Sequence, residues 1–208
     1  MLQVETPSGP ARFHVRGSGP GRVVLGHGAG GGVDAPDLRA VEAAALALGL
    51  QVVLVEQPWR VAGRRVAEAP PRLDAAWLAV LAALPPLPGP LVVGGRSAGA
   101  RVACRTAGAV GAAGVLALAF PLVPPGRDVS REDELHRPEV PVLVVQGARD
   151  AFGVPAAASG REVVVVPGAD HGFAVRRRDG TPAEVAAAVT AAAGEWLARL
   201  APGGQALT

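Results

Sequence analysis

Residues 91–100 read Leu-Val-Val-Gly-Gly-Arg-Ser-Ala-Gly-Ala, an apolar run that leads into Gly95-Arg96-Ser97-Ala98-Gly99. An Ala-rich segment follows, so the stretch predicts a strand, a sharp turn and a helix with Ser97 at the apex. Glycines two residues to either side of the serine avoid clashes between strand and helix, and a strained backbone projects the Oγ above the sheet edge. In a chain with 28 glycines the pattern alone is only suggestive, so the strand and helix around it carry the interpretation.

The other segments predict an α/β fold, a doubly wound, mainly parallel sheet of about eight strands with helices on both faces. Expected strands lie at 2–6, 12–16, 22–26, 51–56, 91–93, 114–120, 141–146 and 162–166, and the first two form a hairpin of edge strands. Expected helices cover 37–49, 73–84, 97–110 and 129–136. A last helix begins at Pro182, behind the capping box of Thr181 and Glu184.

The composition indicates one domain over residues 1–208, because half of the residues are apolar and can form a substantial core. All 20 basic residues are Arg and the formal net charge is only +2. The pI is nevertheless near 9.8, because a chain without Lys and Tyr has few groups that lose a proton at alkaline pH. The high pI is therefore no evidence for a nucleic-acid partner, and we expect none. No secretory signal and no membrane-length apolar run is visible, and the usage is typical of a GC-rich bacterial genome, so we expect a cytoplasmic protein with no membrane partner. The lone Cys104 excludes an internal disulfide.

A serine nucleophile needs a histidine to take its proton and an acid to orient that histidine. Among four histidines, His171 lies just after the last expected strand and is the candidate base. Asp150 follows the preceding strand, which gives the chain order serine, aspartate, histidine expected on this type of sheet. Asp170 is the alternative acid, although its adjacency to His171 argues against it, and an Asx turn or a helix cap is the non-catalytic alternative for Asp150.

An oxyanion formed at Ser97 would need two backbone donors. The residue after the nucleophile, Ala98, should provide one, and the loop His27-Gly28-Ala29-Gly30 should provide the other, from Ala29 in preference to Gly30. A phosphate-cradling loop is the alternative for these glycines, but the chain has no G-x-x-x-x-G-K-[ST] pattern and no Lys. His27 itself is interpreted as structural.

Apolar side chains beside the strand ends are the expected walls of a shallow, open cleft for a short acyl chain: Trp59, Pro121, Leu122, Phe152 and Phe173. Arginines are expected at the same rim, where they would bind a carboxylate on the substrate unless they only make local loop hydrogen bonds: Arg60, Arg96 and Arg149. We expect no metal and no cofactor, because the sequence has no His/Cys cluster at ligand spacing and no G-x-G-x-x-G after a strand.

A resemblance to the α/β-hydrolase superfamily covers nearly the whole chain and rests on four segments, His27-Gly28-Ala29-Gly30, Gly95-Arg96-Ser97-Ala98-Gly99, Gln146-Gly147-Ala148-Arg149-Asp150 and Ala169-Asp170-His171-Gly172-Phe173. The chain is more closely similar to the dienelactone-hydrolase-like branch. The basic residue before the serine and the Gln-Gly-x-Arg-Asp turn resemble the testis-expressed-30/KAT8-complex-subunit-3-like hydrolase family. The resemblance implies a triad of Ser97, Asp150 and His171, and no cap domain, because segment 120–140 is too short for one.

The sequence therefore predicts a hydrolase of a small ester, thioester or lactone. A binding or scaffold protein with a vestigial site is the second hypothesis, because the resembling family includes complex subunits. Acyl transfer to an acceptor other than water uses the same residues and is the third. One fold of this kind hosts many chemistries, so the substrate and the oligomeric state do not follow from the resemblance.

Overall fold

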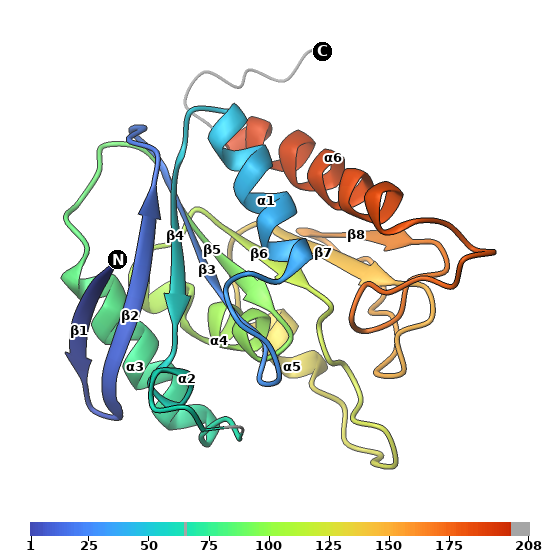
Figure 1. The fold of residues 1–208 in the computed structure, drawn as a ribbon, viewed down its shortest axis with the longest axis horizontal. Coiled ribbons are helices and arrows are strands. Elements are labelled where there is room, and N and C mark those ends of the chain that lie inside the picture. Colours follow the sequence, from blue (N-terminus) through green and yellow to red (C-terminus); the bar gives the residue numbers. More distant parts are fainter. Residues whose placement is uncertain (65, 201–208) are drawn as a thin grey trace.

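The computed structural model describes residues 1–64 and 66–200, so residue 65 and residues 201–208 of the expected domain lie outside it. Its strands form one sheet in the order β1-β2-β4-β3-β5-β6-β7-β8 (Figure 1). The bounds are β1 Leu2–Thr6, β2 Gly9–Arg16, β3 Arg22–Gly26, β4 Gln51–Glu56, β5 Leu91–Arg96, β6 Gly114–Leu118, β7 Val142–Gly147 and β8 Arg161–Val166. β1 pairs antiparallel with β2, and β2 with β4, while the other pairs are parallel. The predicted fold class is confirmed, but only β1 of the hairpin is an edge strand, because β2 lies between β1 and β4.

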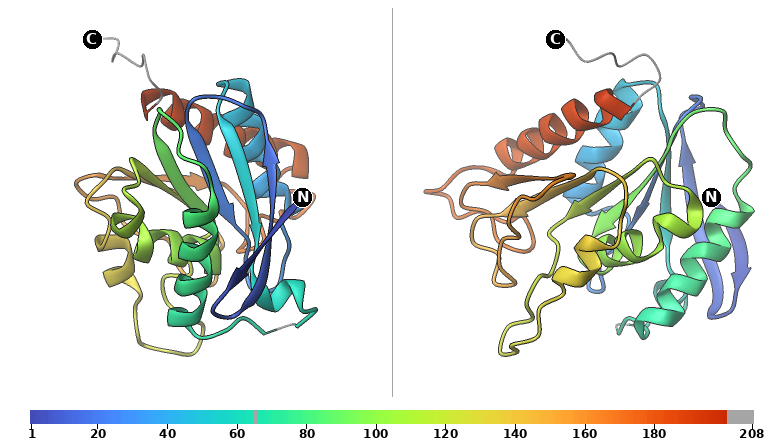
Figure 2. Two further views of the ribbon diagram at one scale, coloured as in Figure 1. Left: turned by 90° about the vertical axis from the view of Figure 1, so that its left-hand side faces the viewer. Right: turned by 180° about the vertical axis from the view of Figure 1, so that it is seen from behind.

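Helices cover both faces of the sheet. Their bounds are α1 Pro36–Ala47, α2 Pro58–Val61, α3 Pro70–Ala83, α4 Ala98–Thr106, η1 Gly108–Val110, α5 Glu132–His136 and α6 Pro182–Leu200. α1 and α6 pack side by side on one face, and α3, α4 and α5 lie on the other (Figures 1 and 2). The expected helix 97–110 is interrupted, since α4 ends at Thr106 and the 3-10 turn η1 ends against Gly111 in the left-handed region.

The central strands are buried on both faces, which explains their continuously apolar sequences. Along β3, Val23 and Leu25 face the core under α1 and α6, whereas Val24 faces the core under α3 and α4. All three side chains are fully buried. Trp196 of α6 fills the first core and Trp77 of α3 fills the second.

The predicted start of α6 is confirmed by its capping contacts. The Thr181 backbone N–H donates to Glu184 Oε2 at 2.7 Å, and the Glu184 N–H donates back to Thr181 Oγ1 at 3.2 Å. This reciprocal pair satisfies donors that a helix start otherwise leaves open. No helix in the described part of the chain has the length and apolar character needed to cross a membrane.

Candidate active site

Ser97 lies in the sharp turn between β5 and α4, with φ 51° and ψ −106°, in a region that residues other than glycine seldom adopt. The turn is tight because its glycines lie against the backbone of Gly26 at the end of β3. A Cβ on Gly99 would lie 2.5 Å from the carbonyl carbon of Gly26, and one on Gly95 would lie 2.9 Å from its nitrogen. Both glycines are therefore required by close backbone packing, as the sequence pattern predicts.

The structure brings the three predicted triad side chains together from the ends of three strands. His171 Nε2 lies 3.0 Å from Ser97 Oγ, and His171 Nδ1 lies 2.8 Å from Asp150 Oδ2. The Asp150 side chain is fully buried, whereas the His171 side chain is 26% exposed. This arrangement suits an imidazole whose Nδ1–H donates to the carboxylate, which leaves Nε2 to accept the serine proton.

Gln146, on β7, holds Asp150 in place, a role that the sequence analysis did not assign to it. Its Nε2 lies 2.7 Å from Asp150 Oδ2 and 3.0 Å from the Phe120 carbonyl, while its Oε1 accepts the Phe120 N–H at 2.8 Å. The other carboxylate oxygen of Asp150 accepts the Phe152 N–H at 2.9 Å. The signal was available, because Gln146 opens the Gln-Gly-x-Arg-Asp turn quoted for the resemblance.

Asp170, the alternative acid, stabilises its own turn, whereas the imidazole is hydrogen-bonded to Asp150 and Ser97. Its Oδ1 accepts the N–H groups of Gly172 at 2.8 Å and Ala174 at 3.0 Å. These bonds fix the loop that carries His171, so Asp170 acts on the site through the backbone.

The backbone N–H groups of Ala98 and Ala29 are open in the described part of the chain, where no acceptor is hydrogen-bonded to either of them. Both residues line the cavity beside Ser97. Ala98 is the first residue of α4, so its N–H belongs to the helix end that carries a partial positive charge.

His27 supports the loop that carries Ala29, as its structural interpretation predicts. Its Nδ1 lies 2.8 Å from the Gly28 carbonyl oxygen, and its Nε2 accepts the Gln57 N–H at 3.2 Å. These contacts fix the neutral tautomer, and burial lowers the pKa of His27. Its ring also packs against Trp59, with 5.0 Å between ring centroids.

A cavity of about 240 Å³ opens beside Ser97. Besides Ser97, Ala98 and Ala29, its lining consists of Ala67, Glu68, Pro70, Leu73, Arg101, Arg105, Pro121, Arg131 and Phe152. Of the predicted walls, Pro121 and Phe152 line it, and the Phe152 ring also packs on His171 with centroids 4.4 Å apart.

Three of the predicted walls lie elsewhere. Trp59 is 1% exposed and Phe173 is 6% exposed, because both rings pack into the cores under the helices. Leu122 packs against the core on the side of α3 and α4. The predicted place of Trp59 and Phe173 in the cleft is therefore wrong, and Leu122 is not among the residues that line the cavity: an apolar side chain next to a strand end can turn inward as well as toward the site.

Arg96 is a structural residue, in contrast to its predicted role at the substrate. Its Nε lies 3.0 Å from Asp37 Oδ2 in α1, and its Nη2 donates to the His171 carbonyl oxygen at 2.9 Å. Burial raises the pKa of Asp37, and the Arg96 guanidinium acts in the opposite direction. Arg96 thus ties the His171 loop to the start of α1, within the site but outside the cavity lining.

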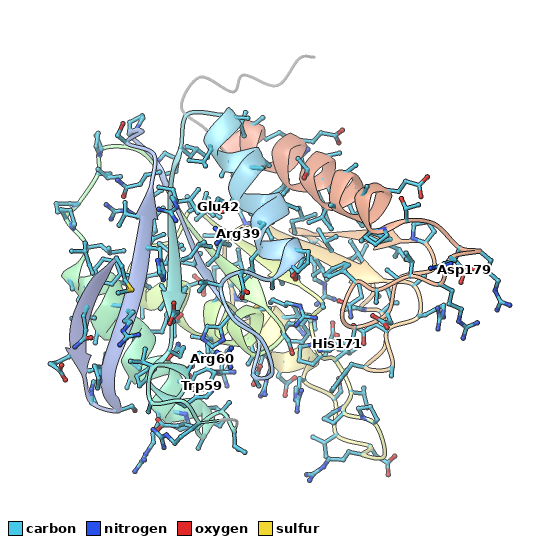
Figure 3. The ribbon with its side chains drawn as sticks, viewed as in Figure 1. Arg39, Glu42, Trp59, Arg60, His171 and Asp179 are labelled. Carbon is cyan, nitrogen blue, oxygen red and sulfur yellow. The ribbon has the colours of Figure 1, made fainter. Side chains whose placement is uncertain are left out.

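Arg60 and Arg149 also lie outside the cavity lining. Figure 3 shows Arg60 beside Trp59 at α2, away from His171. Arg149 donates to the Gly168 carbonyl at 3.2 Å and lies 3.8 Å from Asp179. Figure 3 shows Asp179 in the loop before α6. The sequence analysis missed the arginines that do line the cavity, Arg101, Arg105 and Arg131, because nothing in the local sequence distinguishes them from solvated helix and loop residues.

No group of three His, Cys, Asp or Glu side chains that could hold a metal ion occurs within residues 1–64 and 66–200.

The chain matches the family profile described as "Alpha/beta hydrolase domain" over residues 20–198. No curated protein sequence matches it. Among solved structures, XC6422 from Xanthomonas campestris, described as an a/b serine hydrolase without lid, has a TM-score of 0.71 and 21% identity, and the match covers 94% of this chain and 93% of that one. Dienelactone hydrolase from Anabaena variabilis has a TM-score of 0.70 and 18% identity, with 97% of each chain covered. Est1E from Butyrivibrio proteoclasticus has a TM-score of 0.68 and 16% identity, with 95% and 98% covered.

Proposed function

The chain belongs to the alpha/beta hydrolase domain family, and from this premise we propose that it is a serine hydrolase that cleaves a small ester, thioester or lactone through an acyl-enzyme on Ser97. The observation that carries the proposal is the unbroken chain of contacts from Ser97 Oγ through His171 to the buried carboxylate of Asp150, at 3.0 Å and 2.8 Å. A buried carboxylate behind the imidazole stabilises the imidazolium that forms during the reaction.

In the first half of the reaction, Ser97 Oγ attacks the acyl carbon while its proton passes to His171 Nε2. The carbonyl oxygen becomes an oxyanion, for which the open N–H groups of Ala98 and Ala29 are the proposed donors. His171 then gives the proton to the leaving alcohol or thiol, and the acyl group remains on Ser97.

In the second half, water replaces the leaving group. His171 takes a proton from the water, whose oxygen attacks the acyl carbon, and returns it to Ser97 Oγ as the acid leaves. The partial exposure of the His171 side chain, 26%, supports direct access of water from solvent.

A short acyl group fits the site best. The segment between β6 and α5, 119–131, forms a projecting loop and holds no cap domain (Figure 2). The cavity of about 240 Å³ is small compared with the roughly 300–1,000 Å³ of drug-sized ligand pockets.

We also propose that the chain belongs to the dienelactone-hydrolase-like branch, nearest the testis-expressed-30/KAT8-complex-subunit-3-like family. This proposal rests on the Arg96-Ser97 pair and the Gln146…Asp150 turn.

A fluorophosphonate probe tests the proposal directly. The wild-type protein should be labelled and should hydrolyse p-nitrophenyl acetate and butyrate, whereas Ser97→Ala should do neither. Ser18→Ala, at an exposed serine, is the matched control and should behave as the wild type. Absence of labelling at Ser97 would favour the scaffold hypothesis. Labelling with slow hydrolysis that an added alcohol or amine accelerates would favour acyl transfer.

A further inference from the structure

The cavity beside Ser97 shares two arginines with a second, larger hollow of about 670 Å³. Arg101 of α4 and Arg131, just before α5, line both. The second hollow lies over α4, α5 and the projecting loop, and its remaining lining is Pro124, Arg127, Val129, Ser130, Asp133, Glu134 and Arg137. A ligand that reaches Ser97 at one end therefore has a basic surface beside its other end.

Two of the cavity's arginines are already neutralised by carboxylates. Arg101 makes two hydrogen bonds of 2.7 Å to Glu134. Arg105 makes bonds of 2.8 Å and 2.5 Å to Asp74 and a third, of 3.2 Å, to Glu134. These groups hold one another in fixed positions and leave little charge for a ligand.

The acidic residue on the cavity wall is also engaged. Glu68, whose side chain is 8% exposed, lies 2.8 Å from Arg64. It therefore does not neutralise the arginines of the cavity, and with its own partner it adds no net charge to the wall.

Arg131 differs from its neighbours because no carboxylate of the described residues lies within 4.0 Å of its guanidinium. Its Nη1 donates to the Pro121 carbonyl at 3.0 Å, which uses one of its five N–H donors. Burial lowers the pKa of Arg131; the charges of Arg101, Arg127 and Arg105 act in the same direction, and the charge of Glu134 opposes them. Arg131 is thus a fixed cation in a locally positive environment at the edge of the cavity.

We propose that Arg131, with Arg127 in the adjoining hollow, binds an anionic group on the substrate, a carboxylate or a phosphate, and so makes the protein selective for acidic acyl substrates. The inference rests on the proposed function and assigns its substrate class. The planar guanidinium suits either oxyanion, because it donates two parallel N–H bonds to carboxylate or phosphate. The site replaces the one expected from Arg60, Arg96 and Arg149, which lie outside the cavity lining.

Turnover gives the first test. The ratio of kcat/KM for mono-p-nitrophenyl glutarate to that for p-nitrophenyl butyrate should be about tenfold in favour of the acid at low salt, and should fall as salt screens the charge. Arg131→Gln should bring the ratio close to one, and Arg131→Lys should retain part of it. Arg178→Gln, at an arginine whose side chain is 74% exposed in the loop before α6, should leave the ratio unchanged. A ratio near one in the wild type, or one that survives Arg131→Gln, overturns the proposal.

Binding gives a second test that needs no turnover. Calorimetric titration of the Ser97→Ala protein with glutarate and with inorganic phosphate should show binding that Arg131→Gln weakens about tenfold, and the better ligand tells a carboxylate from a phosphate substrate. Glutaramide, which is neutral, should bind less well. If the wild type hydrolyses neither ester but this binding is seen, the proposed function fails and the anion site stands. If neither anion binds at millimolar concentration, the anion site is refuted even where esters are hydrolysed. Thermal unfolding of each variant verifies folding, and Arg127→Gln serves if Arg131→Gln does not fold.

Discussion

The substitution Gly99→Ala tests whether close packing of the backbone against β3 holds Ser97 in place. A Cβ at this position would lie 2.5 Å from the carbonyl carbon and 3.0 Å from the Cα of Gly26, and closer still to the Gly26 oxygen. Carbon atoms in ordinary contact lie about 3.5–4.0 Å apart. The start of α4 must therefore move by about 1 Å relative to β3, because the close contacts are with backbone atoms and not with the flexible end of a side chain.

That displacement sets the size of the expected effect. Overpacking of this kind costs about 1–3 kcal/mol of unfolding free energy, partly offset by the better helix propensity of alanine. Ser97 precedes Gly99 by two residues, so it moves relative to His171 and to the Ala29 N–H. A misplacement of about 1 Å at a reacting group lowers the rate by about 10²-fold.

Gly108→Ala is the matched control, because no atom lies within 4 Å of a Cβ at that position, in η1. It should leave turnover unchanged and either leave the stability unchanged or raise it by about 0.4–1 kcal/mol. Guanidinium unfolding and kcat/KM with p-nitrophenyl butyrate measure both effects. The close-packing argument fails if the unfolding equilibrium constant and kcat/KM of Gly99→Ala both lie within threefold of those of Gly108→Ala.

Asp150→Asn should lower kcat/KM by on the order of 10⁴, whereas Asp170→Asn should cost far less, because Asp170 accepts only N–H bonds of its own turn; equal losses would contradict the assignment of the acid. Burial lowers the pKa of His27, so the unfolded chain takes up a proton as the pH falls through about 6.5 while the folded chain does not. Below that pH the free energy of unfolding should therefore fall by up to about 1.4 kcal/mol for each unit by which the pH is lowered. Urea titrations at several pH values should show this contribution in the wild type and not in His27→Gln. Burial raises the pKa of Cys104 to about 12, so a thiol reagent should modify it only in denaturant, and rapid labelling of the native protein would show that α4 opens.

The buried strands were predictable because a strand that is buried on both faces has consecutive apolar residues. The apolar runs 23–25 and 52–55 lie within segments 22–26 and 51–56, which match β3 and β4 in their bounds. Strand order is less visible: nothing in segment 12–16 shows that β2 pairs with β4 as well as with β1. The break after α4 was missed because the turn Gly-Ala-Val, 108–110, consists of residue types that also occur within the helix before it.

The proposed triad was easier to place than the walls of the cavity. Ser97, Asp150 and His171 each follow a strand, and parallel strands bring their carboxyl ends to one edge. The direction in which Trp59 points depends instead on packing against His27, thirty-two residues earlier in the chain, which no local pattern records. The role of Arg131 likewise depends on which of the nearby arginines a carboxylate from another element neutralises.

Ser97, Asp150 and His171 follow the ends of sheet strands. Much of the cavity wall comes from two segments that take no part in the sheet, 67–70, which ends at the first residue of α3, and 121–131, which precedes α5. The residues of the proposed triad and much of the cavity wall therefore belong to different parts of the fold. A library of sequences restricted to these two segments can change what the cavity accepts while the packing of Gly26, Gly95 and Gly99 stays untouched. This chain is accordingly a compact starting scaffold for directed evolution, in which most variants should keep their stability and differ in selectivity.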